Sequence, residues 1–147
     1  MSTFLVPSNT VRMKNTDTMS DTLLRKNNFT ILIVEDDCDV SEALALLLST
    51  CGYTTQIAQC RDQAMPLILS RTPSLILLDL NMPGMSADDF VRAVRENDSK
   101  TPIVLFSADA DIERRATSLG LVHFLAKPSD LAGLLLMIRD CLTPIPG

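Results

Sequence analysis

The stretch Leu75–Leu78 is an uninterrupted aliphatic run that leads directly into the carboxylate of Asp79, and Pro83 and Gly84 follow shortly after. A short apolar run of this kind, followed by proline and glycine, predicts a strand buried on both faces and then a loop. In an open parallel sheet, functional groups lie beyond the carboxyl ends of the strands. Asp79 therefore occupies a position typical of a functional side chain, although an aspartate there can also simply cap a turn.

The size and charge of the chain exclude several classes of protein. A length of 147 residues accommodates one domain, and a 46% hydrophobic fraction with 21% charged residues predicts a packed core. The net charge of -5, without a basic stretch, argues against nucleic-acid binding by this chain. No apolar run could span a bilayer, and residues 1–28 do not resemble a secretion signal, so we expect a cytoplasmic protein.

The four cysteines lack paired short spacings and are accompanied by a single histidine, His123. A zinc site requires clustered thiolates and imidazoles, so none is expected, and the cysteines are predicted to be reduced thiols. His123 is interpreted as a surface residue without a catalytic role.

Strand-like and helix-like patterns alternate five times along the chain, which predicts a parallel sheet with helices on both faces. The expected strands cover residues 29–34, 53–58, 75–79, 102–106 and 122–126. The expected helices follow each strand in turn, the later four at about 61–70, 87–96, 112–119 and 129–142. Residues 1–28 are expected to form a flexible tail, residues 29–143 the domain, and residues 144–147 a short C-terminal tail.

The sequence also predicts which residues cap, interrupt or bury these helices. The first helix should bury a stripe that includes Ala43, with Asp39 capping its start and Gly52 ending it. Pro66 predicts a kink or a late start in the second helix, because proline fits only the first helical turn. The last helix should bury Leu131, together with Leu134, Leu135 and Ile138.

Polar side chains follow four of the predicted strands, and parallel strands would bring them to one edge of the sheet: Glu35, Asp36 and Asp37, then Asp79, Ser107 and Lys127. Crowded carboxylates raise one another's pKa, so such a cluster predicts a bound cation, and oxygen ligands suit Mg²⁺. A lysine in the same place makes sense if the ligand is itself negatively charged, as a phosphoryl group is. These residues indicate a carboxylate nucleophile with fixed donors for phosphoryl transfer.

At four places the sequence resembles the response-regulator receiver domains of two-component signalling: Ile31–Asp37, Leu77–Gly84, Ser107-Ala108 and Phe124–Pro128. The resemblance covers roughly residues 29–143. It implies a flavodoxin-like fold, with five strands in the order 2-1-3-4-5 and five helices.

The resemblance also implies a role for each matching residue. Asp79 corresponds to the aspartate that accepts a phosphoryl group from a histidine kinase or a histidine phosphotransfer protein. Lys127 would pair with that phosphoryl group, and Ser107 would be the switch hydroxyl. The remaining roles are those of the magnesium ligands, Glu35, Asp36, Asp79 and the backbone carbonyl of Asn81, and of the switch aromatic, Phe124. Asp37 would have at most a supporting or capping role.

Phosphorylation would then switch a protein-binding surface formed by the fourth helix, the fifth strand and the last helix. Because little sequence follows Leu142, no DNA-binding output domain is expected in this chain. The chain is not expected to be an enzyme beyond Mg²⁺-dependent self-phosphorylation and slow self-dephosphorylation, whose rate Asn81 and Asp109 would tune.

Three alternatives can be weighed from the residues. A phosphohydrolase with an aspartate nucleophile would need an acid at position 81, where Asn81 cannot donate the proton. A nucleotide-binding flavodoxin-like protein would need glycines where Glu35–Asp37 stand. A receiver fold that works as a scaffold without phosphorylation would be expected to have lost the acidic pair, Asp79 or Lys127, and none is lost.

Overall fold

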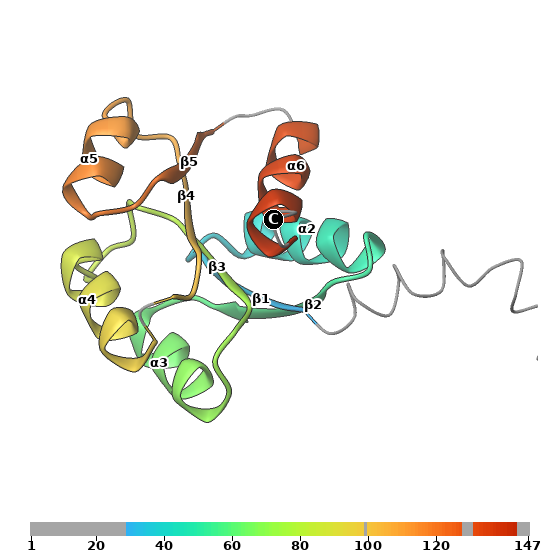
Figure 1. The fold of residues 1–147 in the computed structure, drawn as a ribbon, viewed down its shortest axis with the longest axis horizontal. Helices are drawn as coiled ribbons and strands as arrows, with labels where there is room; N and C mark the ends of the chain where they lie inside the picture. Colours follow the sequence, from blue (N-terminus) through green and yellow to red (C-terminus); the bar gives the residue numbers. More distant parts are fainter. Residues whose placement is uncertain (1–28, 99, 128–130, 144–147) are drawn as a thin grey trace, which may run out of the picture.

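A computed structural model of the protein describes residues 29–98, 100–127 and 131–143, in which five strands alternate with five helices (Figure 1). The strands are β1 (Thr30–Val34), β2 (Thr54–Ala58), β3 (Leu75–Leu78), β4 (Ile103–Ser107) and β5 (His123–Ala126). The helices are α2 (Cys38–Thr50), α3 (Arg61–Ser70), α4 (Ala87–Asn97), α5 (Ile112–Ser118) and α6 (Leu131–Leu142).

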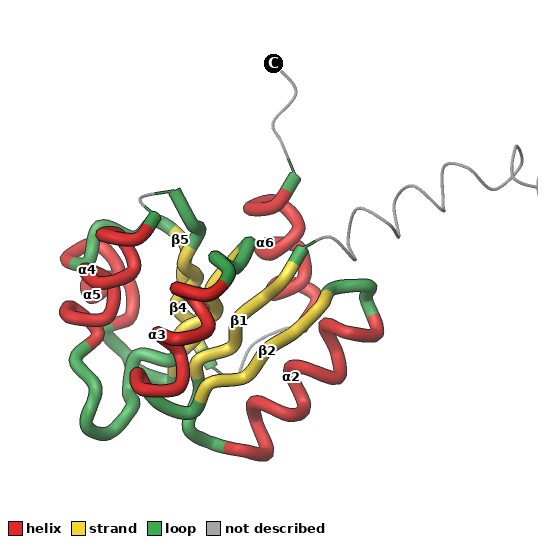
Figure 2. Tube along the Cα trace, turned by 90° about the horizontal axis from the view of Figure 1, so that it is seen from below, coloured by secondary structure: helices red, strands yellow, loops and turns green. Residues whose placement is uncertain are grey.

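All strand pairs in the sheet are parallel, and the strand order is β2-β1-β3-β4-β5. The predicted doubly wound fold and its strand order are therefore confirmed. Figure 2 shows β1 and β2 side by side along the sheet. The last residues of β1 and β3, Val34 and Leu78, are register partners, so the residues that follow them emerge at the same edge of the sheet.

Two apolar layers hold the helices to the sheet. Helices α2 and α6 cover one face, and α3, α4 and α5 cover the other (Figure 1). In β1, Leu32 and Val34 pack into the α3–α4–α5 layer, whereas Ile31 and Ile33 pack into the α2–α6 layer. This alternation follows from the two-residue period of a strand and explains why β1 has no polar face.

The observed element bounds differ from the predicted strands by at most one residue at either end. The cap of α2 was predicted wrongly. Asp37, not Asp39, is the N-cap: its side chain accepts hydrogen bonds from the backbone N–H groups of Asp39 (3.0 Å) and Val40 (3.2 Å). Asp37 has the extended backbone that an N-cap requires, while Asp39 already lies inside the helix. At the other end, Gly52 has a positive φ of 100°, as expected for a helix stop.

Three further helix predictions need correction. Helix α3 starts at Arg61 with Pro66 inside it, so the predicted late start is wrong. Ala43 and Leu131 were predicted to be buried, yet both are exposed, and Leu131 retains 51% of its accessible surface. Both residues line an open apolar groove between α2 and α6 instead of packing into the core.

Other predictions fall outside the part of the chain that the structure describes. These are the tails at residues 1–28 and 144–147, and the start of the last helix near Ser129. The four cysteines are free thiols, as predicted. Among the described residues, no helix combines the length and the apolar character needed to cross a membrane.

Candidate functional site

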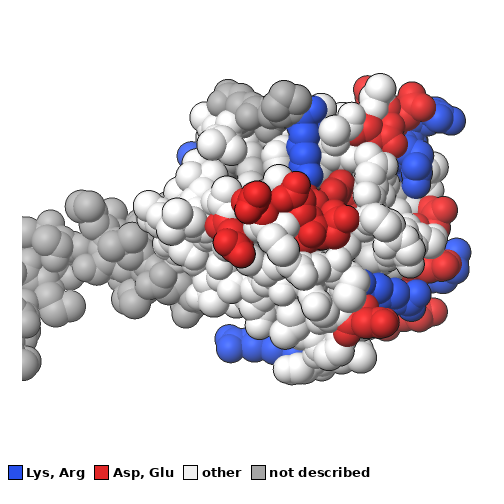
Figure 3. Space-filling view, turned by 180° about the vertical axis from the view of Figure 1, so that it is seen from behind, with Lys and Arg blue, Asp and Glu red and all other residues white. Residues whose placement is uncertain are grey.

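The ends of β1 and β3 bring three carboxylates together. The backbone N–H of Asp79 donates to the carbonyl of Val34 (3.0 Å), which places Asp79 beside Glu35. One carboxylate oxygen from each of Glu35, Asp36 and Asp79 lies within 4.8 Å of the others. Figure 3 shows acidic side chains gathered in one patch with a basic side chain beside them. Such oxygen donors are the ligands that Mg²⁺ prefers.

Lys127 joins this cluster from the end of β5. Its ammonium group forms an ion pair with Oε1 of Glu35 and lies 3.6 Å from Oδ2 of Asp79. The backbone N–H of Lys127 donates to the carbonyl of Ser107 (2.8 Å), which fixes the lysine to the end of β4. Its Nζ also lies 5.3 Å from the centre of the Phe106 ring, close enough for a cation–π interaction.

The pKa of Glu35 reflects the opposing effects of burial and of neighbouring charges in this cluster. This side chain is buried, and burial together with the neighbouring Asp79 carboxyl raises its pKa to about 7, although Lys127 acts in the opposite direction. The ion pair with Lys127 therefore does not outweigh the combined effect of burial and of Asp79 on the pKa of Glu35. A cation bound among these oxygens would favour the ionised form of Glu35.

Ser107 and Asn81 form the neutral side of the site. The Ser107 hydroxyl is fully buried and accepts hydrogen bonds from the backbone N–H of Asp109 and from the side-chain amide of Asn81, both at 3.2 Å. The backbone N–H of Asn81 in turn donates to Oδ1 of Asp79 (3.1 Å). Asn81 thus connects the carboxylate on one strand end to the hydroxyl on the next.

Phe124 lies on β5 opposite Leu105 and packs, half-buried, against the α3–α4–α5 layer. The structure brings Glu35, Asp36, Asp79 and Lys127 into one cluster and links Asn81 and Ser107 to it. It places Phe124 on the same strand as Lys127, within an apolar layer. The roles predicted for these residues stay predictions.

Two features of the site were not predicted from the sequence: the Phe106 ring beside the Lys127 ammonium, and the hydrogen bond from the Asn81 side-chain amide to the Ser107 hydroxyl. Phe106 directly precedes Ser107, and strand alternation could have placed it on the opposite face of β4. No sequence pattern indicated that it approaches a lysine.

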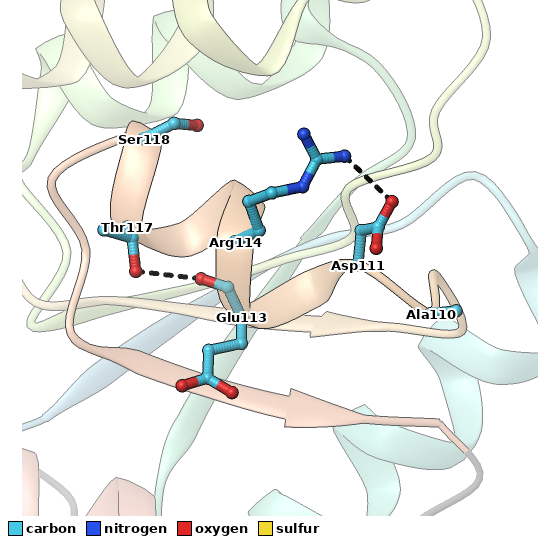
Figure 4. A pocket seen from close by; sticks show the side chains of 6 residues that line it. All are labelled: Ala110, Asp111, Glu113, Arg114, Thr117 and Ser118. Atoms are coloured by element: carbon cyan, nitrogen blue, oxygen red, sulfur yellow. Dashed lines mark hydrogen bonds and ion pairs between the residues drawn. The ribbon is translucent and has the colours of Figure 1, made fainter.

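A separate cavity of about 630 Å³ lies along α5 (Figure 4). Its lining comes from one short segment: Ala110, Asp111, Glu113, Arg114, Thr117 and Ser118. Arg114 forms an exposed ion pair with Asp111 at 2.9 Å, so its charge is already matched within the segment. The cavity is built from none of the predicted site residues.

Comparisons with known proteins agree with this geometry. A family model described as the response regulator receiver domain matches residues 31–139. The response regulator MprA of Mycolicibacterium vanbaalenii is 34% identical over 122 residues, which cover 80% of this chain and 53% of that protein. The transcriptional regulatory protein YkoG of Bacillus subtilis is 34% identical over 114 residues, covering 76% of this chain and 50% of YkoG. The chain thus spans about half the length of these two curated relatives.

Among solved structures, the non-phosphorylated HemR receiver domain from Leptospira biflexa matches with a TM-score of 0.71 at 24% sequence identity. The match covers 82% of this chain and 98% of that one. At this level of identity the likeness concerns the fold, and it reproduces the layered architecture described above.

Proposed function

Since the chain belongs to the response-regulator receiver family, we propose that Asp79 accepts a phosphoryl group from a phosphohistidine of a partner protein. One observation carries the proposal. The carboxylates of Glu35, Asp36 and Asp79 converge within 4.8 Å, and Lys127 pairs with two of them. Receiver domains partner with histidine kinases and are not normally catalytic enzymes, so the partner would supply the phosphoryl group.

In the proposed transfer, a carboxylate oxygen of Asp79 attacks the phosphorus atom and forms the new O–P bond. The P–N bond to the histidine breaks, and its electron pair remains on the imidazole nitrogen. Lys127, already 3.6 Å from Oδ2 of Asp79, would balance the charge that the phosphoryl group brings. The Ser107 hydroxyl would exchange its present partners for a phosphoryl oxygen.

The donor set fits a magnesium ion. The ligands would be the carboxylates of Glu35, Asp36 and Asp79 with the backbone carbonyl of Asn81, all of them hard oxygen donors. Bound Mg²⁺ supplies positive charge that screens the carboxylates and the incoming phosphoryl oxygens. The gathering of three carboxylates beside one lysine supports this assignment.

The proposed output is a change in protein binding. Ser107 and Phe124 would move together after phosphorylation and bias the surface of α5, β5 and α6 between two states. The phosphorylatable unit would be the domain of residues 29–143. Slow self-dephosphorylation would follow, and Asn81 and Asp109 would tune it; in support, both donate to the Ser107 hydroxyl.

The test is phosphorylation with Mg²⁺ and a small acyl phosphate, followed by mass spectrometry of the intact protein. The parent protein should gain the mass of one phosphoryl group. Asp79→Asn should abolish this gain, because an amide oxygen is a poor nucleophile, and removal of Mg²⁺ by a chelator should suppress it. Equal labelling of the Asp79→Asn protein would overturn the assignment.

Asp37→Asn is the matched control. It removes a carboxylate from the same loop but preserves the cap of α2, because asparagine caps helices about as well as aspartate. Its labelling should equal that of the parent. Failure of the parent itself to accept the phosphoryl group would favour the alternative of a binding scaffold that works without phosphorylation.

A further inference from the structure

A second groove lies at the opposite end of α2 from the acidic cluster, between that end and α6. It encloses about 300 Å³ and is lined by Cys51, Tyr53, Ala132, Leu135, Leu136 and Arg139. Apart from the arginine, these side chains present mainly apolar surface. Leu136 retains 49% of its accessible surface, which is a substantial apolar exposure for one side chain. We call this the α2–α6 groove.

The chain enters the described fold beside this groove. The backbone N–H of Thr54, the first residue of β2, donates to the carbonyl of Phe29 (3.0 Å), so Phe29 lies near the groove residue Tyr53, which directly precedes β2. Phe29 and Tyr53 also pack into the same apolar layer. Phe29, the first residue that the structure describes, therefore lies beside the groove wall.

The sequence just before Phe29 has the chemistry to fill the groove. Leu23 and Leu24 are adjacent aliphatic residues, and Asp21 lies two positions before them. Leu24 is five residues before Phe29, a reach of about 17 Å when extended. Leucines match the apolar wall, and Asp21 would add a second carboxylate near Arg139, which already forms an exposed ion pair with Asp140 at 3.4 Å.

We propose that residues 21–24 of the same chain occupy the α2–α6 groove, with the two leucines on its apolar wall and Asp21 toward Arg139. Covalent attachment favours this occupant over a free partner, because a short linker gives a high effective concentration. The segment would then shield Leu136, and its docking does not depend on phosphorylation of Asp79. Residues 21–24 belong to the segment 1–28, for which the sequence predicts a flexible tail.

Cys51 allows a direct test, because it lines the groove and is a free, half-buried thiol. Cys38 is an exposed free thiol at the other end of α2 and is an internal reference. The alkylation rate of each cysteine is measured by peptide mass spectrometry in the parent and in the full-length Leu23→Ser/Leu24→Ser protein. The double substitution should raise the Cys51 rate severalfold relative to Cys38.

Tyrosine fluorescence gives an independent measurement, because Tyr53 is the single tyrosine of a chain without tryptophan. Quenching by acrylamide should increase in the Leu23→Ser/Leu24→Ser protein. Both substitutions precede β1, so the described core is unaltered. An unchanged ratio of Cys51 to Cys38 alkylation together with unchanged quenching would overturn the proposal.

The matched control is Phe4→Ser/Leu5→Ser, which removes an apolar pair farther from β1. This variant should behave as the parent does, and an effect equal to that of Leu23→Ser/Leu24→Ser would refute the assignment to residues 21–24. Alkylation is also measured over a range of protein concentrations. Protection of Cys51 that disappears on dilution would identify a second copy as the occupant and overturn the intramolecular docking.

Discussion

The interior of β3 and the residue that follows it are neighbours in the chain but differ sharply in what they contribute. Leu75–Leu78 is almost completely removed from solvent and surrounded by apolar side chains on both faces. Asp79, one residue later, faces two other carboxyl groups and a lysine. The strand interior stabilises the fold, whereas the strand end concentrates charge that the fold alone does not balance.

Because of this contrast, we expect the largest loss of stability from a substitution in the strand interior. Leu78→Ala should lower the free energy of unfolding by about 2–5 kcal/mol, because Leu78 is fully buried and its truncation leaves a cavity. Urea unfolding followed by circular dichroism measures the loss. Leu69→Ala is the control, since Leu69 on α3 is 65% exposed and should change stability by less than about 0.5 kcal/mol. Similar losses in both proteins would contradict the contrast.

At the strand end, stability should depend on pH through Glu35. Its pKa is about 7 in the folded protein against an ordinary value of 4.5, so the folded state retains a proton that the unfolded chain releases in this range. Stability should therefore fall as pH rises from 4.5 to about 7. Removing this carboxyl in Glu35→Gln should abolish roughly 1–3 kcal/mol of that fall.

The measurement is urea unfolding in a chelator-containing buffer at about pH 5 and about pH 8. Glu42→Gln, which removes an exposed carboxylate from α2, should keep the pH dependence of the parent. If Glu35→Gln and the parent lose the same stability between the two pH values, a group other than Glu35 causes the pH dependence.

A smaller effect is expected at Asp37, the third acid after β1. Asp37→Ala removes the acceptor for two backbone N–H groups at the start of α2 and should cost about 1 kcal/mol. Asp37→Asn should cost only a few tenths of a kcal/mol, because asparagine keeps the cap. Thermal unfolding distinguishes the two. Equal losses would show that Asp37 acts through its charge, as its neighbours in the acidic cluster do.

The order of strands and helices was predicted well from the sequence, because each element has its own residue pattern. Buried aliphatic runs such as Leu75–Leu78 read as strands, and alternation with helices leaves a parallel sheet as the simplest arrangement. The convergence of Glu35, Asp79 and Lys127 followed from the same rule, since parallel strands end at one edge. Their gathering is thus a consequence of topology, whereas the roles assigned to them depend on the family resemblance.

What escaped prediction depends on backbone geometry and on neighbours distant in sequence. Asp37 and Asp39 are chemically identical caps, and only the extended backbone of Asp37 distinguishes them. Leu131 fits the apolar periodicity of α6, but periodicity alone does not distinguish a side chain that reaches the core from one that lines an open groove. Phe106 lies on β4 and Lys127 follows β5, so their contact depends on how the strands pair. Neither strand's own sequence indicates it.

The ion pair between Lys127 and Glu35 joins positions 92 residues apart. Glu35 therefore takes its counter-charge from a residue near the other end of the domain sequence. Lys127 also follows β5, the outermost strand, which is paired on one side alone. Detachment of that strand would remove Lys127 from the cluster while Glu35, Asp36 and Asp79 stay at their own strand ends, so pairing at the edge of the sheet controls the net charge of the cluster.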